Sequence, residues 1–443
     1  MAKGKKKEVL TLEERLQPYR VPGNWCWTFI QYVSEVITGG TPSKKCAEYY
    51  DGKFPFFKPS DLDSGRHVIN ASEYLSNAGK AVSRVIPEQS TAVCCIGSIG
   101  KCGFLEVEGS TNQQINSAIP KFNALYLYYF CNTHYFVEQL WEKASATTIS
   151  IVNKSKMENC VFPLPPLLEQ CRIVDRIESL FAKLDEARQK VQDVLDGFEP
   201  RRAAILHKAF NGELTAQWRK AHGVGMEEGW ERKRFDEVAI IRSNLVEPAD
   251  FPDLPHIAPD NIERKTGVLL EYHTIAEDGV TSGKHHFYPG QILYSKIRPY
   301  LSKVVAVDFE GLCSADMYPI EAKGDAKCLW YYMLSEEFLE QASSAGSRSV
   351  LPKINQKELS ALTVELPALI DEQGEITNIL ECFFAKERQA KEAAETVLEQ
   401  INLIKKTILA RAFRGELGTN DPAEESTLEL IKQTLSETIA NNG

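Results

Sequence analysis

The stretch Ile205–Leu214, ILHKAFNGEL, recurs as ILARAFRGEL at Ile408–Leu417, with seven of the ten positions identical. Extended backwards at the same offset of 203, the match runs without a gap from Gln170/Gln373 to Leu214/Leu417, with 16 of 45 positions identical. Self-similarity over such a length is the sequence signature of a repeated architecture. The chain is therefore predicted to contain two copies of one structural unit.

Within the repeated block, apolar residues recur mostly at alternating steps of four and three, with charged residues and glutamine between them. An average spacing of 3.5 residues is typical of coiled-coil helices. Gly197 and Pro200 predict a kink in the first helix, whereas the second should run straight. The glycine of each GEL suits a left-handed C-terminal cap. The predicted seam comprises Ile173, Ile177, Leu180, Leu184, Ala187, Val191, Val194, Phe198 and Ile205 in the first copy, and Ile376, Leu380, Phe383, Ala390, Ala394, Val397, Ile401, Ile404 and Ile408 in the second.

Between the helical blocks lie two segments of similar length, in which glycine and proline turns separate short β-branched or aromatic runs. This pattern predicts two small α+β domains, each built round a curved sheet and each followed by a long helix. Two ordinary amphipathic helices in separate cores remain the alternative to a paired coil. The predicted divisions are an N-terminal extension (1–21), domain one (22–163), a central helical region (164–215), a linker (216–228), domain two (229–365), a second helical region (366–418) and a tail (419–443).

Bulk composition narrows the class of protein. No apolar run approaches the ~20 residues that span a bilayer, and no secretory signal follows the N-terminal lysines. The 11 cysteines include no CxxC pair, which indicates reduced thiols, a cytoplasmic location and no zinc site. Net charge is −10, yet residues 1–163 carry 18 basic and 15 acidic side chains, against 15 and 21 in residues 230–365. Charge alone does not decide whether the partner is DNA.

Several motifs together resemble one family. They are GGTPSKKCAEYYDGKFPFFKPSDL from Gly39, TNQQINSAIP from Thr111, ILYSKIRPYL from Ile292, CSADMYPI from Cys313, LPPLLEQ from Leu164, and AFNGELTAQWR from Ala209. Their combination is similar to the specificity subunit of Type I restriction-modification enzymes, with two target recognition domains. The resemblance covers about Pro22 to Leu417.

The resemblance implies that each domain recognises one half of a split double-stranded DNA sequence. It also implies that the helices pair antiparallel, set the spacing, and dock two methyltransferase subunits, which restriction subunits then join. A subunit of this kind has no catalytic centre, so S-adenosylmethionine, ATP and magnesium are expected on partner subunits only.

Three short motifs could indicate an enzyme instead. GSIGKCG from Gly97 lacks the GxxxxGK[ST] spacing of a phosphate loop, and is interpreted as a tight turn between strands. PDNIERK from Pro259 contains the letters of a nuclease site, but its carboxylates are only three residues apart, so a polar turn is favoured. Pro165-Pro166 lacks the flanking residues of an adenine methyltransferase motif. No intrinsic catalysis is predicted.

DNA contacts are expected from residues that hydrogen-bond base edges and from cations that hold phosphates. The amides of TNQQIN could instead satisfy a buried turn, Arg298 could form a solvated salt bridge, and His285-His286 is expected to be an exposed loop pair rather than a metal site. Few cations are available, so weak DNA binding by the chain alone is expected. The candidates are Thr41, Ser43, Lys44, Lys58, Ser60, Lys101, Asn112, Gln113 and Gln114 in domain one, and His285, His286, Lys296, Arg298, Tyr300, Lys303 and Arg348 in domain two.

Two other functions fit parts of the sequence. The recognition subunit of a two-chain Type II restriction-modification enzyme would share the DNA-binding features. A coiled-coil scaffold without DNA contact would share the helices, but it would not need two duplicated, loop-rich domains. Copurification with a methyltransferase distinguishes the scaffold from a specificity subunit.

Overall fold

The structure is a computed structural model, and it describes residues 11–145, 150–225, 229–346 and 352–428. The chain divides into two compact units, each assembled from segments that are distant in sequence. The first unit comprises Met1–Lys190 and Thr396–Gly443, and the second comprises Val191–Glu395. The first unit therefore combines the N-terminal part of the chain with the C-terminal end of the repeat.

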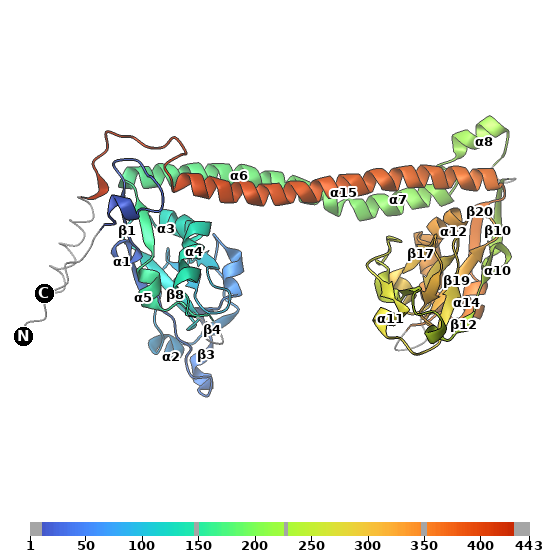
Figure 1. The fold of residues 1–443 in the computed structure, drawn as a ribbon, viewed down its shortest axis with the longest axis horizontal. Coiled ribbons are helices and arrows are strands. Elements are labelled where there is room, and N and C mark those ends of the chain that lie inside the picture. The colour runs from blue at the N-terminus through green and yellow to red at the C-terminus, as the bar shows by residue number, and fades with distance from the viewer. Residues whose placement is uncertain (1–10, 146–149, 226–228, 347–351, 429–443) are drawn as a thin grey trace, which may run out of the picture. The chain divides into compact units, whose positions relative to one another are not determined.

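In its described residues the first unit contains a four-stranded sheet, a three-stranded sheet and a two-stranded pair, rather than the single curved sheet predicted from the sequence (Figure 1). The four-stranded sheet is antiparallel, in the order β2 (Ser34–Thr38), β8 (Ile115–Pro120), β5 (Thr91–Cys94), β6 (Cys102–Phe104). The three-stranded sheet has the order β4 (Glu73–Leu75), β3 (Tyr50–Phe57), β7 (Ser110–Thr111), with β3 and β7 parallel. The antiparallel pair joins β1 (Cys26–Phe29) to β9 (Val161–Leu164).

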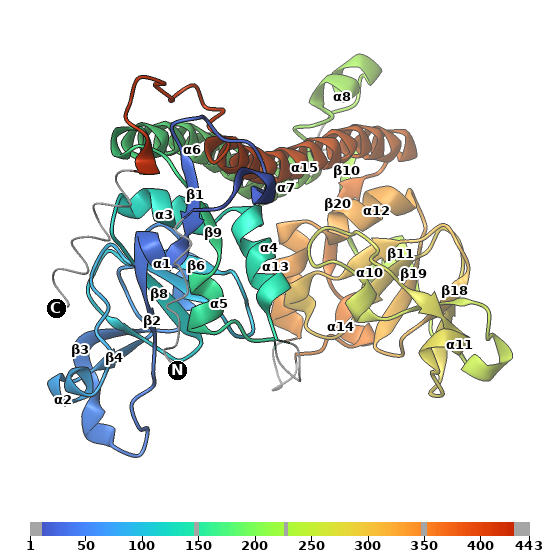
Figure 2. The same cartoon turned by 60° about the vertical axis from the view of Figure 1, so that its left-hand side comes forward.

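Most short helices in the described part of the first unit begin where a polar side chain accepts a hydrogen bond from a backbone N–H. Asn123 Oδ1 accepts from Tyr126 N at 2.9 Å, and Thr133 and Asn153 cap the next two helices in the same way. Capping satisfies backbone N–H groups that otherwise lack partners at a helix start. Figures 1 and 2 show α3 between the long helix α6 and the four-stranded sheet. The helices are α1 (Ile30–Val33), α2 (Asn77–Ala81), α3 (Ala124–Cys131), α4 (His134–Lys143) and α5 (Lys154–Glu158), with 3-10 turns η1 (Glu14–Leu16), η2 (Ala47–Tyr49) and η3 (Asp61–Ser64).

The second unit repeats this topology. Its antiparallel sheet has the order β11 (Ala239–Ile241), β19 (Met317–Ala322), β16 (Ile292–Ser295), β17 (Val304–Ala306). Its second sheet has the order β12 (Leu245–Val246), β15 (Lys284–Phe287), β18 (Gly311–Cys313), β13 (Pro255–Ile257), β14 (His273–Thr274), with β13 and β18 parallel. The pair β10 (Trp230–Arg234) and β20 (Thr363–Pro367) matches β1 and β9.

Three helices of the second unit begin at caps that match those of the first, formed by Asp325, Ser335 and Asn355. The duplicated sequence therefore produces a duplicated fold, to which the second unit adds strands β12 and β15 in the described residues. The helices are α8 (Ala216–His222), α10 (Phe235–Val238), α11 (Ile275–Asp278), α12 (Ala326–Met333), α13 (Glu336–Ala345) and α14 (Gln356–Ser360), with 3-10 turns η4 (Pro248–Asp250), η5 (Pro259–Asn261) and η6 (Pro299–Leu301).

The repeated blocks form long helices, as predicted. The first copy is broken at Gly197 into α6 (Leu167–Asp196) and α7 (Phe198–Phe210), whereas α15 (Ile370–Ala412) is continuous. The kink predicted in the first copy is thus present, and the second copy runs without interruption. Gly212 and Gly415, the glycines of the two GEL sequences, have φ values of 80° and 72°, in the left-handed region that glycine adopts readily.

The long helices pair antiparallel within each unit. In the first unit, Lys405 Nζ lies 2.5 Å from Asp185 Oδ1, and Arg188 Nη1 donates to Asn402 Oδ1 at 3.0 Å. Residue numbers rise along one helix while they fall along the other, which defines the antiparallel direction. In the second unit, the ion pair between Arg202 and Glu387, at 3.2 Å, follows the same rule.

The two copies of the repeated phrase pack in crossed order. The second copy lies in the core of the first unit, and the first copy lies in the core of the second unit. Phe413 is 1% exposed and lies with Tyr126 and Phe130 in the core of the first unit. Its counterpart Phe210 is 7% exposed and packs at 5.1 Å on Tyr332 in the second unit. The phrase is therefore repeated because two equivalent cores need the same closing segment.

The motif LPPLLEQ (Leu164–Gln170) and its counterpart LPALIDEQ (Leu366–Gln373) each contain a buried glutamate. Trp25 Nε1 donates to Glu169 at 2.8 Å, and Trp230 Nε1 donates to Glu372 at 3.1 Å. Each carboxylate also binds the segment after a GEL: Asn420 donates to Glu169 at 2.7 Å, and Thr215 and Arg219 donate to Glu372. Hydrogen bonds of this kind compensate for the cost of burying a carboxylate.

The predicted apolar seam is only partly buried. Ile173, Ile177, Ile376 and Leu380 are fully buried, whereas Ala187 and Ala390 are exposed, as are Val194 at 44%, Val397 at 39% and Ile404 at 45%. The sequence pattern overestimated the seam because one partner helix covers only a narrow stripe of another. Those four residues also pack against a domain core, whereas Ile401 is 3% exposed without belonging to either core.

Candidate nucleic-acid interface

Three loops meet at one edge of the first unit and recur at the second. After β5, Cys95 N donates to Gln114 O at 2.7 Å, and after β3, Asn112 N donates to Phe57 O at 3.2 Å. The matching bonds in the second unit run from Lys296 N to Asp316 O at 3.0 Å and from Ser314 N to Ile257 O at 2.9 Å. We call these equivalent regions the first loop edge (residues 58–64, 95–101 and 112–114) and the second loop edge (residues 258–261, 296–303 and 314–316).

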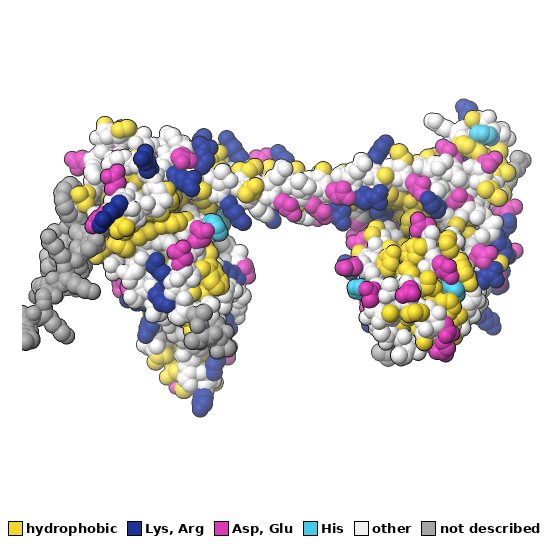
Figure 3. Space-filling model, in the orientation of Figure 1, with side chains coloured by type: hydrophobic (Ala, Val, Ile, Leu, Met, Phe, Trp, Pro, Cys, Tyr) yellow, Lys and Arg dark blue, Asp and Glu magenta, His cyan; other side chains and the backbone are white. Residues whose placement is uncertain are grey.

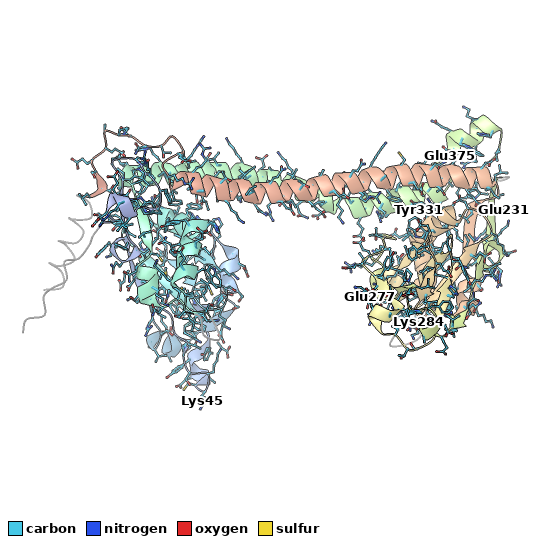
Figure 4. The ribbon with its side chains drawn as sticks, viewed as in Figure 1. Lys45, Glu231, Glu277, Lys284, Tyr331 and Glu375 are labelled. Carbon is cyan, nitrogen blue, oxygen red and sulfur yellow. The ribbon has the colours of Figure 1, made fainter. Side chains whose placement is uncertain are left out.

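A fourth loop is held against the first loop edge by glycine. A Cβ on Gly39 would lie 2.2 Å from Asn112 O, so only glycine allows this approach. Gly40 N donates to Thr111 O at 2.8 Å, which fixes the start of the loop that carries Thr41, Ser43 and Lys44. Figure 4 places Lys45, in the same loop, at the end of the first unit remote from helix α6. The fold therefore presents this loop to solvent.

The amides of TNQQIN divide into structural and exposed groups. Asn112 is 8% exposed, its Oδ1 accepts from Gln114 N at 3.0 Å, and its Nδ2 donates to Gln114 Oε1 at 2.9 Å. Asn112 thus stabilises the turn, as the alternative interpretation of these amides expected. Gln113 is exposed and accepts from Thr41 Oγ1 at 2.5 Å, so its side chain lies where a base edge could reach it.

The lysines of the first loop edge and its neighbouring loop are paired with carboxylates. Lys44 and Lys58 both contact Glu73, Lys58 at 3.0 Å, and Lys101 Nζ lies 2.6 Å from Asp63 Oδ1. Burial would raise the pKa of Glu73, but the hydrogen bonds from both lysines hold it below its ordinary value. Ser43 and Ser60 are exposed beside these cations. The candidates of domain one are therefore brought together, but as a network of neutralised charges.

The second loop edge carries four of the candidates predicted for domain two. Lys296 Nζ donates to Ala315 O at 2.6 Å, and Lys303 Nζ donates to Pro259 O at 2.7 Å. Arg298 and Tyr300 are exposed on the loop between β16 and β17. Arg298 has φ 48°, a left-handed conformation that costs energy in a residue other than glycine. Within the described part of the chain, the exposed Arg298 side chain forms no ion pair.

The prediction that His285-His286 is an exposed loop pair is wrong. Both residues lie in strand β15 and are less than a tenth exposed. Burial, with a smaller contribution from Lys296, lowers the pKa of His285, and His286 Nε2 lies 2.8 Å from Glu310 Oε1. The run KHHF gives no β-branched signal, so the sequence did not indicate a strand. Arg348, the remaining candidate, lies outside the described residues.

The acidic partners of these lysines were not predicted from the sequence. Asp63, Glu73, Asp260 and Asp316 each contact a lysine of the candidate sets, and Lys353 contacts Asp316 at 3.4 Å. The sequence gives no signal for these partners, because each carboxylate meets its lysine only through the fold. Within the described ranges, no group of three histidine, cysteine or acidic residues is placed to hold a metal ion, and no helix is long and apolar enough to cross a membrane.

Two copies of one domain, each with an equivalent loop edge and each closed by helices from the other half of the chain, define a duplicated recognition subunit. The model of the Type I restriction modification DNA specificity domain matches residues 22–195 and again residues 227–400. The chain belongs to this family, and its function is the recognition of DNA sequence.

Curated relatives agree with this assignment. The chain is 38% identical over 335 residues to the Type I restriction enzyme EcoDI specificity subunit of Escherichia coli, which covers 69% of this chain and 75% of that protein. It is 22% identical to the StySPI specificity subunit of Salmonella potsdam, over 92% of each chain. It is also 22% identical to the EcoKI specificity subunit of Escherichia coli strain K12, over 96% of this chain and 97% of the other. These names place the chain among specificity subunits, the recognition subunits of such enzymes, and not among their catalytic subunits.

Solved structures share the fold. A chain from a study of complex assembly and conformational transition in the type I R-M system has a TM-score of 0.70 at 18% identity, covering 90% of this chain and 100% of that one. The HsdS subunit from Thermoanaerobacter tengcongensis has a TM-score of 0.56 at 19% identity, covering 90% and 99%. The predicted fold class, two α+β domains with paired long helices, is confirmed.

Proposed function

We propose that this chain recognises a bipartite DNA site, with one half-site for each target recognition domain (residues 22–163 and residues 229–365). The observation that carries the proposal is the equivalence of the two loop edges, which are joined by the same two backbone hydrogen bonds but carry different side chains. Equivalent scaffolds with different loops suit two half-sites of different sequence, because base contacts depend on side chains and not on the scaffold.

At each loop edge, exposed polar groups face bases and cations face phosphates. Gln113 and Arg298 are the exposed side chains with donors suited to base edges. Lys58, Lys101 and Lys303 hold phosphates and fix the position of the duplex. The remaining exposed candidates, Thr41, Ser43, Lys44, Ser60 and Tyr300, supply further contacts to the sugar-phosphate backbone, and Lys296 supports the second loop edge from its base.

The long helices serve the rest of the complex. We assign them the docking of two methyltransferase subunits and, on that core, of the restriction subunits, which carry S-adenosylmethionine, ATP and magnesium. Exposed apolar side chains on these helices support the assignment, since Leu403 is 64% exposed and Val194 and Val397 occupy equivalent exposed positions. The helices also set the length of the unread stretch between half-sites, and the complex acts in the cytoplasm.

Mapping of methylated adenines tests the proposal. The chain is expressed with its methyltransferase subunit in a host without other adenine methylation, and the modified sites are sequenced. We expect one motif of two specific parts separated by a constant number of unread base pairs. A single continuous motif, or modification that does not require this chain, contradicts the proposal.

A further inference from the structure

The two loop edges share an ion pair that the recognition of DNA does not explain. Lys101 Nζ lies 2.6 Å from Asp63 Oδ1, and Lys303 Nζ lies 3.4 Å from Asp260 Oδ1. The lysines are structural equivalents, because Cys94 N donates to Lys101 O at 2.7 Å just as Ser295 N donates to Lys303 O at 3.0 Å. A cation expected to bind phosphate is thus engaged by a carboxylate at the same place in both domains.

The two aspartates lie on equivalent loops but at different positions within them. Lys58 N donates to Asp61 Oδ2 as Ala258 N donates to Asn261 Oδ1, so Asp260 takes the position of Ser60. Asp63 lies in η3, which follows β3, and Asp260 lies in η5, which follows β13. The order of strands around β3 and β13 is the same in the two units. The pairing therefore joins the same two loops twice, although the sequences of those loops differ.

The two aspartates are not needed for packing, because their side chains are exposed. The side chain of Asp63 is 75% exposed and that of Asp260 is fully exposed, whereas the lysine side chains are 26% and 16% exposed. Neighbouring Asp61 provides a contrast, since its carboxylate accepts backbone N–H bonds from Lys58 at 2.7 Å and Ser72 at 3.0 Å. Asp61 maintains the loop, and Asp63 faces the solvent from which DNA would approach.

An exposed ion pair contributes little stability, typically below about 1 kcal/mol, so either pair can exchange its carboxylate for another anion. A DNA phosphate is such an anion, and contacts between lysine and phosphate provide most of the sequence-independent affinity of DNA-binding proteins. A carboxylate beside the lysine lowers the affinity for DNA in two ways. The ion pair must break before the lysine can bind the phosphate, and the carboxylate repels the phosphate. Figure 3 shows both basic and acidic side chains on the displayed face of each unit.

We propose that Asp63 and Asp260 are masking residues, which occupy the phosphate-binding lysine of their own loop edge and thereby hold down sequence-independent DNA binding. The proposal rests on the proposed function, because it takes the loop edges as the DNA-contacting surface. Each aspartate acts through its lysine and makes no favourable contact with DNA itself. With the lysines masked, base contacts decide where the complex stays bound.

The test uses the full chain and a fluorescent duplex of random sequence, with binding followed by anisotropy over a series of salt concentrations. Three variants are compared with the unsubstituted chain: Asp63→Asn, Lys101→Gln, and the double variant. Lys101→Gln should weaken binding and reduce the slope of log affinity against log salt by about 0.9, the value for one lost phosphate contact. Asp63→Asn should tighten binding about two- to fivefold, the range expected for removal of one exposed ion pair.

The double variant tests whether Asp63 affects DNA binding through Lys101. When Lys101 is already glutamine, Asp63→Asn should change affinity by less than it does alone, because no lysine remains to be released. Glu88→Gln is the matched control, since Glu88 is exposed and precedes β5, at the opposite end of that strand from the loop edge. It removes the same charge and should leave affinity nearly unchanged. Asp260→Asn and Lys303→Gln repeat the comparison in the second unit.

The outcomes separate the two proposals. If Lys101→Gln and Lys303→Gln weaken binding but neither aspartate variant tightens it, the masking proposal is overturned and the DNA-contacting surface stands. Equal tightening by Asp63→Asn and Glu88→Gln overturns masking as well, because net charge then explains the effect. If the lysine variants bind like the unsubstituted chain while melting normally, the loop edges are not the DNA surface, and both proposals fail.

Discussion

Substitution of the two repeated phenylalanines should destabilise the two domains in crossed order. Phe413, from the second copy of the repeat, is 1% exposed with its ring centroid 4.9 Å from Tyr126 and 5.4 Å from Phe130. Phe210, from the first copy, is 7% exposed against Tyr332. Replacing a buried phenylalanine by alanine typically costs about 3–5 kcal/mol, through lost transfer energy and the cavity left behind. Phe413→Ala should therefore affect the first domain, and Phe210→Ala the second.

Hydrogen exchange followed by mass spectrometry measures this directly on the full chain. A loss of about 3 kcal/mol should speed exchange through opening of the affected core by about a hundredfold. For Phe413→Ala, strands β5 and β8 should lose protection, while β16 and β19 keep theirs; Phe210→Ala should give the reverse. Leu403→Ala is the control, because Leu403 is 64% exposed and its removal should change stability by less than about 0.5 kcal/mol. Loss of protection in the second domain for Phe413→Ala, or in the first domain for Phe210→Ala, would refute the crossed packing.

Three further predictions concern the helices, pH and cofactor binding. Replacing Leu180 and Leu184 together with aspartate should lower the free energy of unfolding of the first unit by about 2 kcal/mol in urea titration, since both leucines are half buried; melting like the unsubstituted chain would show that α6 is not packed there. Glu178 accepts hydrogen bonds from Tyr129 at 2.7 Å and from Arg66 at 3.1 Å. Burial raises the pKa of Glu178, but these hydrogen bonds outweigh burial and lower the pKa below 4.5. Its contribution to stability is therefore complete above pH 4.5 and lost as pH falls below it, and Glu178→Gln should remove that part of the acid sensitivity in urea titrations; an unchanged pH profile would contradict this. The purified chain should not bind S-adenosylmethionine, which stoichiometric binding in calorimetry would overturn.

The sequence predicted the features that depend on local chemistry and periodicity. The repeat predicted the duplication, and Gly197 predicted the break between α6 and α7 because glycine weakens a helix. Gly212 and Gly415 predicted the left-handed caps. Each of these residues acts through its own backbone, so no knowledge of tertiary contacts was needed.

Features that depend on distant contacts were not predicted. The helical pattern alone could not show that Val194 and Val397 lack a covering partner, since burial depends on what packs against each face. The second sheet of each unit includes strands of two or three residues, such as β7 and β14, which are too short to leave a pattern in the sequence. The sequence located most candidate residues on the loop edges, but it gave no sign that Asp63 and Asp260 would lie beside the lysines, because those loops are joined only in the fold.

A domain exchange tests the central claim most directly. Residues 229–365 are replaced by the matching domain of a relative that recognises a different sequence, and methylated adenines are mapped in cells that express the chimera with its methyltransferase subunit. If each domain recognises its own half-site, one half of the methylated motif changes, while the other half and the number of unread base pairs stay the same. A chimera that melts normally and methylates DNA, but changes both halves together or neither half, would contradict recognition by two independent domains.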